Sequence, residues 1–315
     1  MQDIHKGIVA MVAGCVIWGL SPIYYRWLAE VPPVEVLAHR ALWSLILFVG
    51  VLALQRRLAQ MRSAFATRAH LRAITASAVM ISVNWFLFIY GTQVDRTTET
   101  SMGYFMVPLA AVVIGRLAFA ERLDRWQQLS VVFCAAAVLV LSIGLGHLPW
   151  ISLLLAITFA LYGAIKKHLP LGPVVSVTCE VAMFLPLALI YLAQVHVMGQ
   201  GAFGQSWQIS GLLVLSGPMT AVPMMLFSAA ARRLDLATLG VLQYVNPSLQ
   251  FFCAAVLFGE PQTVWHLMAF PLIWVALAIY SVALWRQEAS RKAVMAASTV
   301  SATVKKSSSE ASAKP

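Results

Sequence analysis

The chain has 315 residues, of which 60% are hydrophobic and only 11% are charged, and its net charge is +10. A soluble protein of this size carries about 25% charged residues because its surface faces water. The composition therefore excludes a soluble enzyme, a nucleic-acid-binding protein and a secreted domain. It indicates a polytopic membrane protein, since roughly 20 apolar residues of helix cross a bilayer.

Charged residues, prolines and glycines divide the chain into ten predicted spans. The first follows a short basic start and ends in an aromatic and arginine segment, 24–27, where a signal peptide would have a small-residue cleavage site, so we interpret it as an uncleaved span. Two long uncharged runs each hold two spans, because helix-breaking segments at 144–149 and 194–210 interrupt them. The ten spans are expected at about 6–28, 34–54, 72–92, 98–120, 126–144, 150–166, 173–194, 210–231, 236–259 and 263–285.

The distribution of positive charge predicts the orientation. With the N-terminus in the cytoplasm, 18 of the 22 lysines and arginines fall in cytoplasmic segments and only Arg26 and Arg96 fall outside. Losing or adding one span in the middle would destroy this asymmetry. We therefore expect both termini to lie in the cytoplasm, and we expect residues 287–315 to form a disordered, basic cytoplasmic tail.

An internal repeat relates the two halves of the chain. Four anchors of the fourth span and the segment after it recur in the ninth at a constant offset of 139, which pairs Pro108, Phe119, Glu121 and Trp126 with Pro247, Phe258, Glu260 and Trp265. Because each half holds five spans, an odd number, the halves must have opposite orientation. The predicted fold is an all-α integral membrane protein of two inverted five-helix repeats, 1–145 and 146–286.

Several segments resemble the RarD group of EamA-type proteins in the drug/metabolite transporter superfamily. They are IWGLSPIYYRWL and VPPVEVLAHRALWS (17–28, 31–44), NWFLFIYG (84–91), ETSMGYFMVPL through AERL (99–123), LYGAIKK (161–167) and VLQYVNPSLQFFCAAVLFGEP (241–261). The sequence departs from the usual pattern at Val107, where Asn is common, and at Lys166, where Arg is usual. The resemblance implies an inner-membrane exporter or permease for a small drug-like or metabolite solute.

Arg40 and Glu180 are charged residues at the depth of the membrane, where charge is costly, and they occupy repeat positions at an offset of 140. Arg40 could extend to the outer headgroups, or it could face a central cavity and hold an anionic group, with Trp43 one turn away. Glu180 could bind and release a proton during transport, because burial favours its neutral form. Alternatively, Lys166 or Lys167 could neutralise it.

A polar and aromatic set gathers where Pro108 and Pro247 are expected to kink their helices and expose carbonyl groups. Glu99 begins the fourth span and is expected to complement the helix dipole. The candidate solute-binding residues, in addition to Arg40 and Trp43, are Trp18, Asn84, Trp85, Tyr104, Gln243, Tyr244 and Asn246, and Tyr162 adds to the aromatic surface. Such a cavity suits flat, partly apolar solutes.

The leading hypothesis is a secondary active transporter that works by alternating access and exports its solute in exchange for protons, with a small-molecule solute and the lipid bilayer as its partners. No Walker motif, G-x-S-x-G or H-E-x-x-H occurs, so no nucleotide, metal or other cofactor and no enzyme activity is expected. The four cysteines are scattered and are expected to be structural thiols. A channel, a regulatory membrane subunit and, less favoured, an intramembrane enzyme stay open as alternatives, and a homodimer is allowed.

Overall fold

The computed structural model describes residues 2–119, 123–167, 169, 171–234 and 236–312. In this part of the chain the backbone is helical and contains no β-strand, as the composition predicted. The helices are α1 (Gln2–Trp27), α2 (Pro33–Leu54), α3 (Gln60–Ala64), α4 (Arg68–Gln93), α5 (Thr97–Phe119), α6 (Arg125–Leu145), α7 (Trp150–Lys166), α8 (Pro173–Val197), α9 (Trp207–Ala231), α10 (Leu236–Gln243), α11 (Val245–Phe252), the π-helix η1 (Cys253–Leu257) and α12 (Val264–Ser312).

Eight of the described helices are long and apolar enough to span a membrane, and α7 is apolar but shorter, with 17 residues. Their bounds agree closely with the spans expected from the sequence. The predicted ninth span is instead divided into α10, α11 and η1. Short α3 lies in a segment where no helix was predicted.

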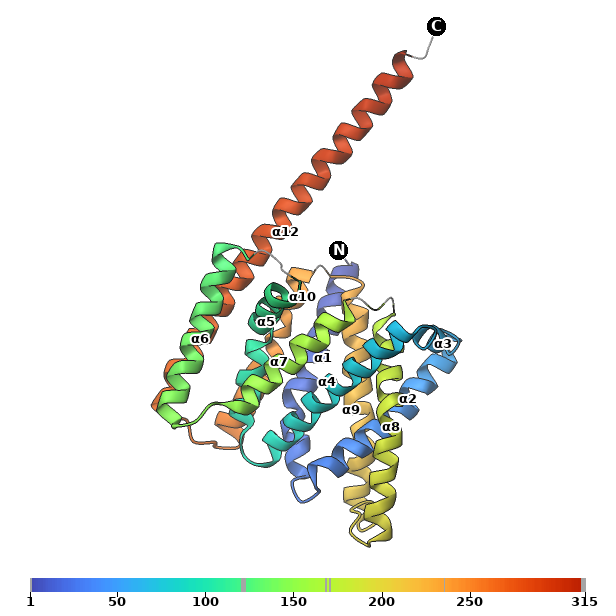
Figure 1. Ribbon diagram of the computed structural model, residues 1–315, viewed down its shortest axis with the longest axis vertical. Coiled ribbons are helices and arrows are strands. Elements are labelled where there is room, and N and C mark those ends of the chain that lie inside the picture. The colour runs from blue at the N-terminus through green and yellow to red at the C-terminus, as the bar shows by residue number, and fades with distance from the viewer. Residues whose placement is uncertain (1, 120–122, 168, 170, 235, 313–315) are drawn as a thin grey trace.

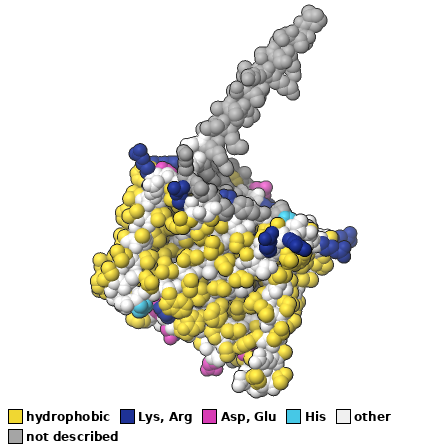
Figure 2. Space-filling model, viewed as in Figure 1, with side chains coloured by type: hydrophobic (Ala, Val, Ile, Leu, Met, Phe, Trp, Pro, Cys, Tyr) yellow, Lys and Arg dark blue, Asp and Glu magenta, His cyan; other side chains and the backbone are white. Residues whose placement is uncertain are grey.

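The long helices form one bundle, and both the N-terminus and the outer part of α12 lie at the same end of it (Figure 1). Inside the bundle α5 packs against α7, α4 packs against α7 and α8, and α2 packs against α8 and α9, while α6 and α12 form a pair at one edge. Hydrophobic side chains cover the visible flank, and most Lys and Arg side chains in view gather at the end that holds the N-terminus (Figure 2). We call this end, with α3 and the start of α6, the basic end.

Two glycines allow helices around the bundle centre to approach closely. A Cβ atom at Gly103 of α5 would lie 2.9 Å from the Ser152 carbonyl oxygen of α7, and one at Gly19 of α1 would lie 2.6 Å from the Leu249 Cβ of α11. Real Cβ atoms do not reach such distances, so a larger residue at either position would push the two backbones apart.

The division of the ninth span occurs at Tyr244, three residues before Pro247. Proline has no backbone N–H, so Pro247 cannot donate to the Gln243 carbonyl, and α10 ends at that residue. Pro108, the repeat partner of Pro247, lies inside the continuous helix α5. Glu121, one of the repeat anchors, lies outside the described residues.

A carboxylate joins distant segments at the end of the bundle opposite the basic end. Glu260 follows η1 and accepts hydrogen bonds from the backbone N–H groups of Thr97 and Thr98, each at 2.7 Å, and from the Thr98 hydroxyl at 2.7 Å. These N–H groups begin α5 and have no partner within their own helix, so a negative charge there also complements the helix dipole. Glu260 therefore ties the start of α5 to the chain that follows α11.

The C-terminal segment differs from the expectation. Residues 287–315 were expected to be disordered, whereas α12 continues as a helix to Ser312 and projects beyond the bundle (Figure 1). The physical reason is local: the segment contains no proline or glycine before its last residue, and six of residues 287–312 are alanine, which favours helix.

Candidate functional site

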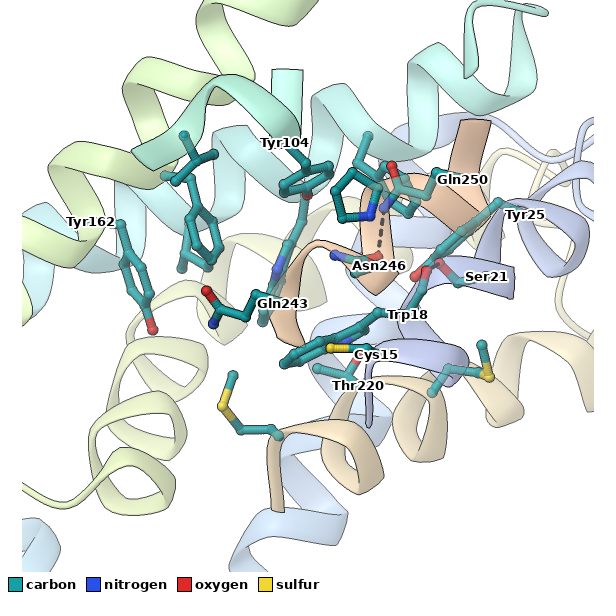
Figure 3. A pocket seen from close by; sticks show the side chains of 18 of the residues that line it. Cys15, Trp18, Ser21, Tyr25, Tyr104, Tyr162, Thr220, Gln243, Asn246 and Gln250 are labelled. Carbon is teal, nitrogen blue, oxygen red and sulfur yellow. Dashed lines mark hydrogen bonds between the residues drawn. The ribbon is translucent and has the colours of Figure 1, made fainter. Parts of the chain in front are cut away.

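A cavity of about 140 Å³ lies in the middle of the bundle. Helices from both halves of the chain form its wall, and Figure 3 shows side chains from α1, α5, α7, α9, α10 and α11 converging on it. The lining residues are Cys15, Trp18, Ser21, Tyr25, Arg40, Ile81, Trp85, Phe88, Tyr104, Val107, Pro108, Phe159, Tyr162, Met219, Thr220, Met224, Gln243, Tyr244, Asn246, Pro247 and Gln250.

Arg40 is the cation in the cavity wall. Its Nε donates to the Thr220 hydroxyl at 2.8 Å, and one terminal nitrogen donates to the Tyr25 hydroxyl at 2.9 Å. The guanidinium carbon lies 4.0 Å from the centre of the Trp85 ring, which fits a cation–π contact. Arg40 is 5% exposed, and no carboxylate among the described residues pairs with it. Neutral groups therefore hold a buried positive charge that has no counter-ion in the described part of the chain.

Aromatic rings form much of the remaining wall. The Tyr104 ring makes edge contacts with Phe88 and Phe159, at centroid distances of 5.7 and 5.9 Å. The Tyr104 hydroxyl donates to the Asn84 side-chain oxygen at 2.9 Å, and the Asn84 amide nitrogen donates to the Leu155 carbonyl at 3.0 Å. Asn84 is thus a fully buried residue behind the wall that fixes the orientation of Tyr104.

Amide side chains of α10 and α11 supply further polar groups to the cavity wall. Gln250 donates to the Asn246 side-chain oxygen at 2.9 Å (Figure 3), while its own amide oxygen is buried without a hydrogen-bond partner among the described residues. An unsatisfied buried acceptor costs about 1–3 kcal/mol. A solute that donates a hydrogen bond to Gln250 would recover that energy.

Glu180 lies beside the cavity and does not line it. Its carboxylate pairs with Lys166 Nζ at 3.1 Å and accepts hydrogen bonds from Ser176 at 2.9 Å, Tyr162 at 3.0 Å and Ser77 at 3.1 Å. The sequence left open whether Glu180 carries a proton or is neutralised by a lysine, and the structure shows the ion pair between Lys166 and Glu180. Tyr162 joins this cluster to the cavity because its ring lines the cavity.

The sequence-predicted residues divide into two groups. The cavity brings together Trp18, Arg40, Trp85, Tyr104, Pro108, Gln243, Tyr244, Asn246 and Pro247. Trp43 and Asn84 were also expected in the wall and do not line it. The Trp43 backbone packs against Gly217 of α9, and its ring lies 6.1 Å from the Phe203 ring, whereas Asn84 acts through Tyr104.

Several cavity residues were not anticipated, chief among them Tyr25, Thr220 and Gln250. Gln250 lies in α11 one turn beyond Asn246, so an amide at helical spacing was a usable signal. Thr220 could not be found in this way, because only the packing of α9 against α2 brings it to Arg40.

Glu99 is the acidic residue in the first turn of α5. Arg96 contacts it, with Nε 2.6 Å from the Glu99 Oε1 atom, as suits a first-turn carboxylate. The four cysteines are buried free thiols. The described residues contain no group of three or more His, Cys, Asp or Glu side chains that could hold a metal ion.

The model of the EamA-like transporter family matches residues 5–143. Protein RarD of Escherichia coli (strain K12) is 35% identical over 280 residues, which cover 89% of this chain and 95% of that protein. The chain belongs to the EamA-like transporter family, as a RarD-like member. An uncharacterized transporter, PA0485 of Pseudomonas aeruginosa, is 36% identical to this RarD-like chain over 286 residues, covering 90% of this chain and 96% of that one.

A third relative is named chloramphenicol-sensitive protein RarD, also from Pseudomonas aeruginosa. It is 29% identical over 298 residues, covering 92% of the RarD-like chain and 99% of its own length. A chain of known crystal structure matches with a TM-score of 0.58 at 15% identity, covering 90% of this chain and 99% of that one, which supports the fold alone. With its apolar helices and its relatives named as transporters, the RarD-like chain is a multi-pass bacterial membrane transporter of the drug/metabolite superfamily, a class that points away from enzyme activity.

Proposed function

We propose that this protein is a secondary active transporter of small aromatic or partly apolar solutes that carry a negative group, including amino-acid-like compounds. The observation that carries the proposal is Arg40, a buried cation in the wall of a central cavity that has no counter-ion among the residues the structure describes. A buried charge needs a partner, and an anionic solute would supply one. Trp18, Trp85 and Tyr104 offer ring faces and edges beside it.

We propose alternating access between two inverted repeats, 1–145 and 146–286, as the transport mechanism. The helix packing supports this, because it pairs corresponding elements of the two halves: α1 packs against α9 as α7 packs against α4, and α5 packs against α7 as α11 packs against α1. The α6 and α12 pair and the α2 and α8 pair each join equivalent helices. This exchange pattern is what ten spans related by a pseudo-twofold axis would produce.

The proposed location is the inner membrane, with both termini in the cytoplasm. The basic end then faces the cytoplasm, as the positive-inside rule favours. The end at which Glu260 contacts the start of α5 faces outward.

The proposed direction is export, with Glu180 exchanging protons. Support comes from its burial, its contact with Lys166 and its link through Tyr162 to the cavity. Lys166 is 20% exposed in its side chain and lies at the end of α7, which gives the cluster a route to the aqueous phase at the basic end.

The test is transport by purified protein in proteoliposomes, with a panel of labelled aromatic amino acids, aromatic organic acids and chloramphenicol, with and without a pH gradient. We expect saturable, gradient-driven flux of at least one anionic or zwitterionic solute, and loss of most of that flux in Arg40→Ala. Arg116→Ala is the matched control, because Arg116 is an exposed arginine of α5 that does not line the cavity.

The outcomes separate the open alternatives. Flux that neither saturates nor responds to a pH gradient would indicate a channel. Absence of flux for the whole panel would favour a regulatory subunit. Equal flux in Arg40→Ala and Arg116→Ala would remove Arg40 from the solute site.

A further inference from the structure

Tyr162 lies at the boundary between the central cavity and the buried ion pair. Its ring forms part of the cavity wall, close to Gln243 in Figure 3. Its hydroxyl donates to Glu180 Oε2 at 3.0 Å and accepts from Lys166 Nζ at 2.8 Å. A phenolic hydroxyl has a single proton to donate, so Tyr162 cannot donate to Glu180 and to a group in the cavity at the same time.

Among the described residues, the Tyr162 hydroxyl is the polar group that connects the Glu180 carboxylate to the cavity. The charged and titratable groups near the cluster are Lys166 on α7 and Cys179 on α8, while α4 contributes the Ser77 hydroxyl. Arg40, on α2, faces the cavity on the far side of Trp85. A second void, of only about 10 Å³, touches both Glu180 and Trp85, and it is lined almost wholly by apolar groups.

We propose, building on the proton exchange suggested above, that Tyr162 is the positioning residue through which protonation of Glu180 opposes solute binding. With Glu180 ionised, the carboxylate holds the Tyr162 hydroxyl and keeps the ring back in the cavity wall. A proton that reaches Oε2 from the aqueous phase by way of the Lys166 end turns this acceptor into an O–H donor. Lys166 then loses its counter-charge.

Protonation of Glu180 therefore changes the space available in the cavity. When the Oε2–H group points at Tyr162, the hydroxyl accepts from Glu180 and its own proton is free to bond to an acceptor in the cavity, where Gln243 and Tyr104 lie. A ring that enters a space of about 140 Å³ occupies volume that a solute needs. When a solute binds, the ring returns to the wall, Glu180 regains its bond from Tyr162, and the proton leaves to water. Solute and proton therefore displace each other without direct contact.

The first experiment needs no solute. Trp18 and Trp85 line the same cavity, so tryptophan fluorescence of the detergent-solubilised protein should change between neutral and acidic pH. We expect this change to be lost in Tyr162→Phe, which keeps the ring, and in Glu180→Gln. Tyr24→Phe is the matched control: it removes a hydroxyl that donates to the Leu212 carbonyl and that lies outside the cavity lining, so the change should persist. An unaltered change in Tyr162→Phe would overturn the proposal.

The second experiment measures proton release. Phenylalanine, phenylpyruvate or chloramphenicol is added to weakly buffered protein containing a pH-sensitive dye. We expect release of up to one proton per bound molecule in the parent, with an affinity that falls by at most about tenfold per unit of decreasing pH, and none in Tyr162→Phe. Binding without proton release in the parent would overturn the proposal. If none of the three probes binds while the fluorescence change follows Tyr162, the switch is supported and the proposed solute class fails.

Discussion

Glu260 allows the contact between the two halves at the proposed outward end to be tested quantitatively. In Glu260→Ala, the Thr97 and Thr98 N–H groups at the start of α5 lose their acceptor. Leaving a buried donor unsatisfied costs about 1–3 kcal/mol, and the lost charge–dipole interaction adds about 0.3–1 kcal/mol. Water at this end of the bundle would replace part of the loss. We therefore expect the contact to weaken by about 2–3 kcal/mol.

This free energy sets the expected change in population. If the contact forms only when the outward end is closed, about 1.4 kcal/mol changes the ratio of closed to open molecules tenfold, so the ratio should fall by roughly 30- to 150-fold. Glu260→Gln retains one acceptor oxygen and should show about half of the free-energy change.

The assay is labelling from outside by a membrane-impermeant maleimide at Ser21→Cys, a cavity position on α1, in a background without the four native cysteines. Glu99→Gln is the matched control, because Glu99 lies in the same turn of α5 and its carboxylate bonds to Arg96, in the first half of the chain, while its bond with Ser152 of α7 uses the backbone carbonyl that the substitution keeps. Labelling should rise strongly in Glu260→Ala and little in Glu99→Gln. If the two variants label at the same rate, Glu260 does not hold the outward end closed.

Three further predictions follow from contacts already described. Arg40→Lys should bind anionic solute more weakly than the parent and more tightly than Arg40→Ala. Lysine keeps the positive charge, but it cannot reproduce both hydrogen bonds to Thr220 and Tyr25. Equilibrium binding measures this order, and an equal loss of affinity in the two variants would contradict it. Glu180→Gln and Lys166→Met should each destabilise the protein by about 3–5 kcal/mol, because each leaves a buried charged or polar partner unpaired. In detergent unfolding, the double variant should have a free energy of unfolding much closer to that of the parent. Additive losses would show that the two residues do not act as a pair. Gly103→Ala should lower stability by about 1–3 kcal/mol by separating α5 from α7, and an unchanged melting temperature would refute this packing argument.

Much of the bundle could be predicted from the sequence, because a membrane span is recognised by a run of about twenty apolar residues and by the charged residues at its ends. The all-helical class and most helix bounds followed from this signal. The division at Tyr244 was only partly anticipated: Pro247 predicted a kink, yet the same residue type at Pro108 leaves α5 continuous. The residues beside the two prolines differ, with Val107 before Pro108 and Asn246 before Pro247, so a proline alone does not predict whether its helix divides.

The cavity was predictable to the extent that polar and aromatic residues stand out in apolar spans. Arg40 and Tyr104 were found in this way, and both line it. Trp43 was misplaced because its closeness to Arg40 along the helix says nothing about which helix it meets, and it meets α9 at Gly217. Thr220, the residue that fixes Arg40, lies 180 positions away, so only the folded packing brings the two together.

The divided ninth span makes the two halves mechanically unequal. An isolated helix shorter than about 12 residues is marginal in water, and α10 has 8 residues, so its helical state depends on the neighbours it packs against. Its counterpart in the first half, α5, runs for 23 residues as a single rod. Amide hydrogen exchange should therefore be faster in α10 than at the equivalent depth of α5. Under the proposed alternating access, opening toward the basic end can bend the ninth span between α10 and α11, whereas opening at the other end would have to move α5 as one continuous helix.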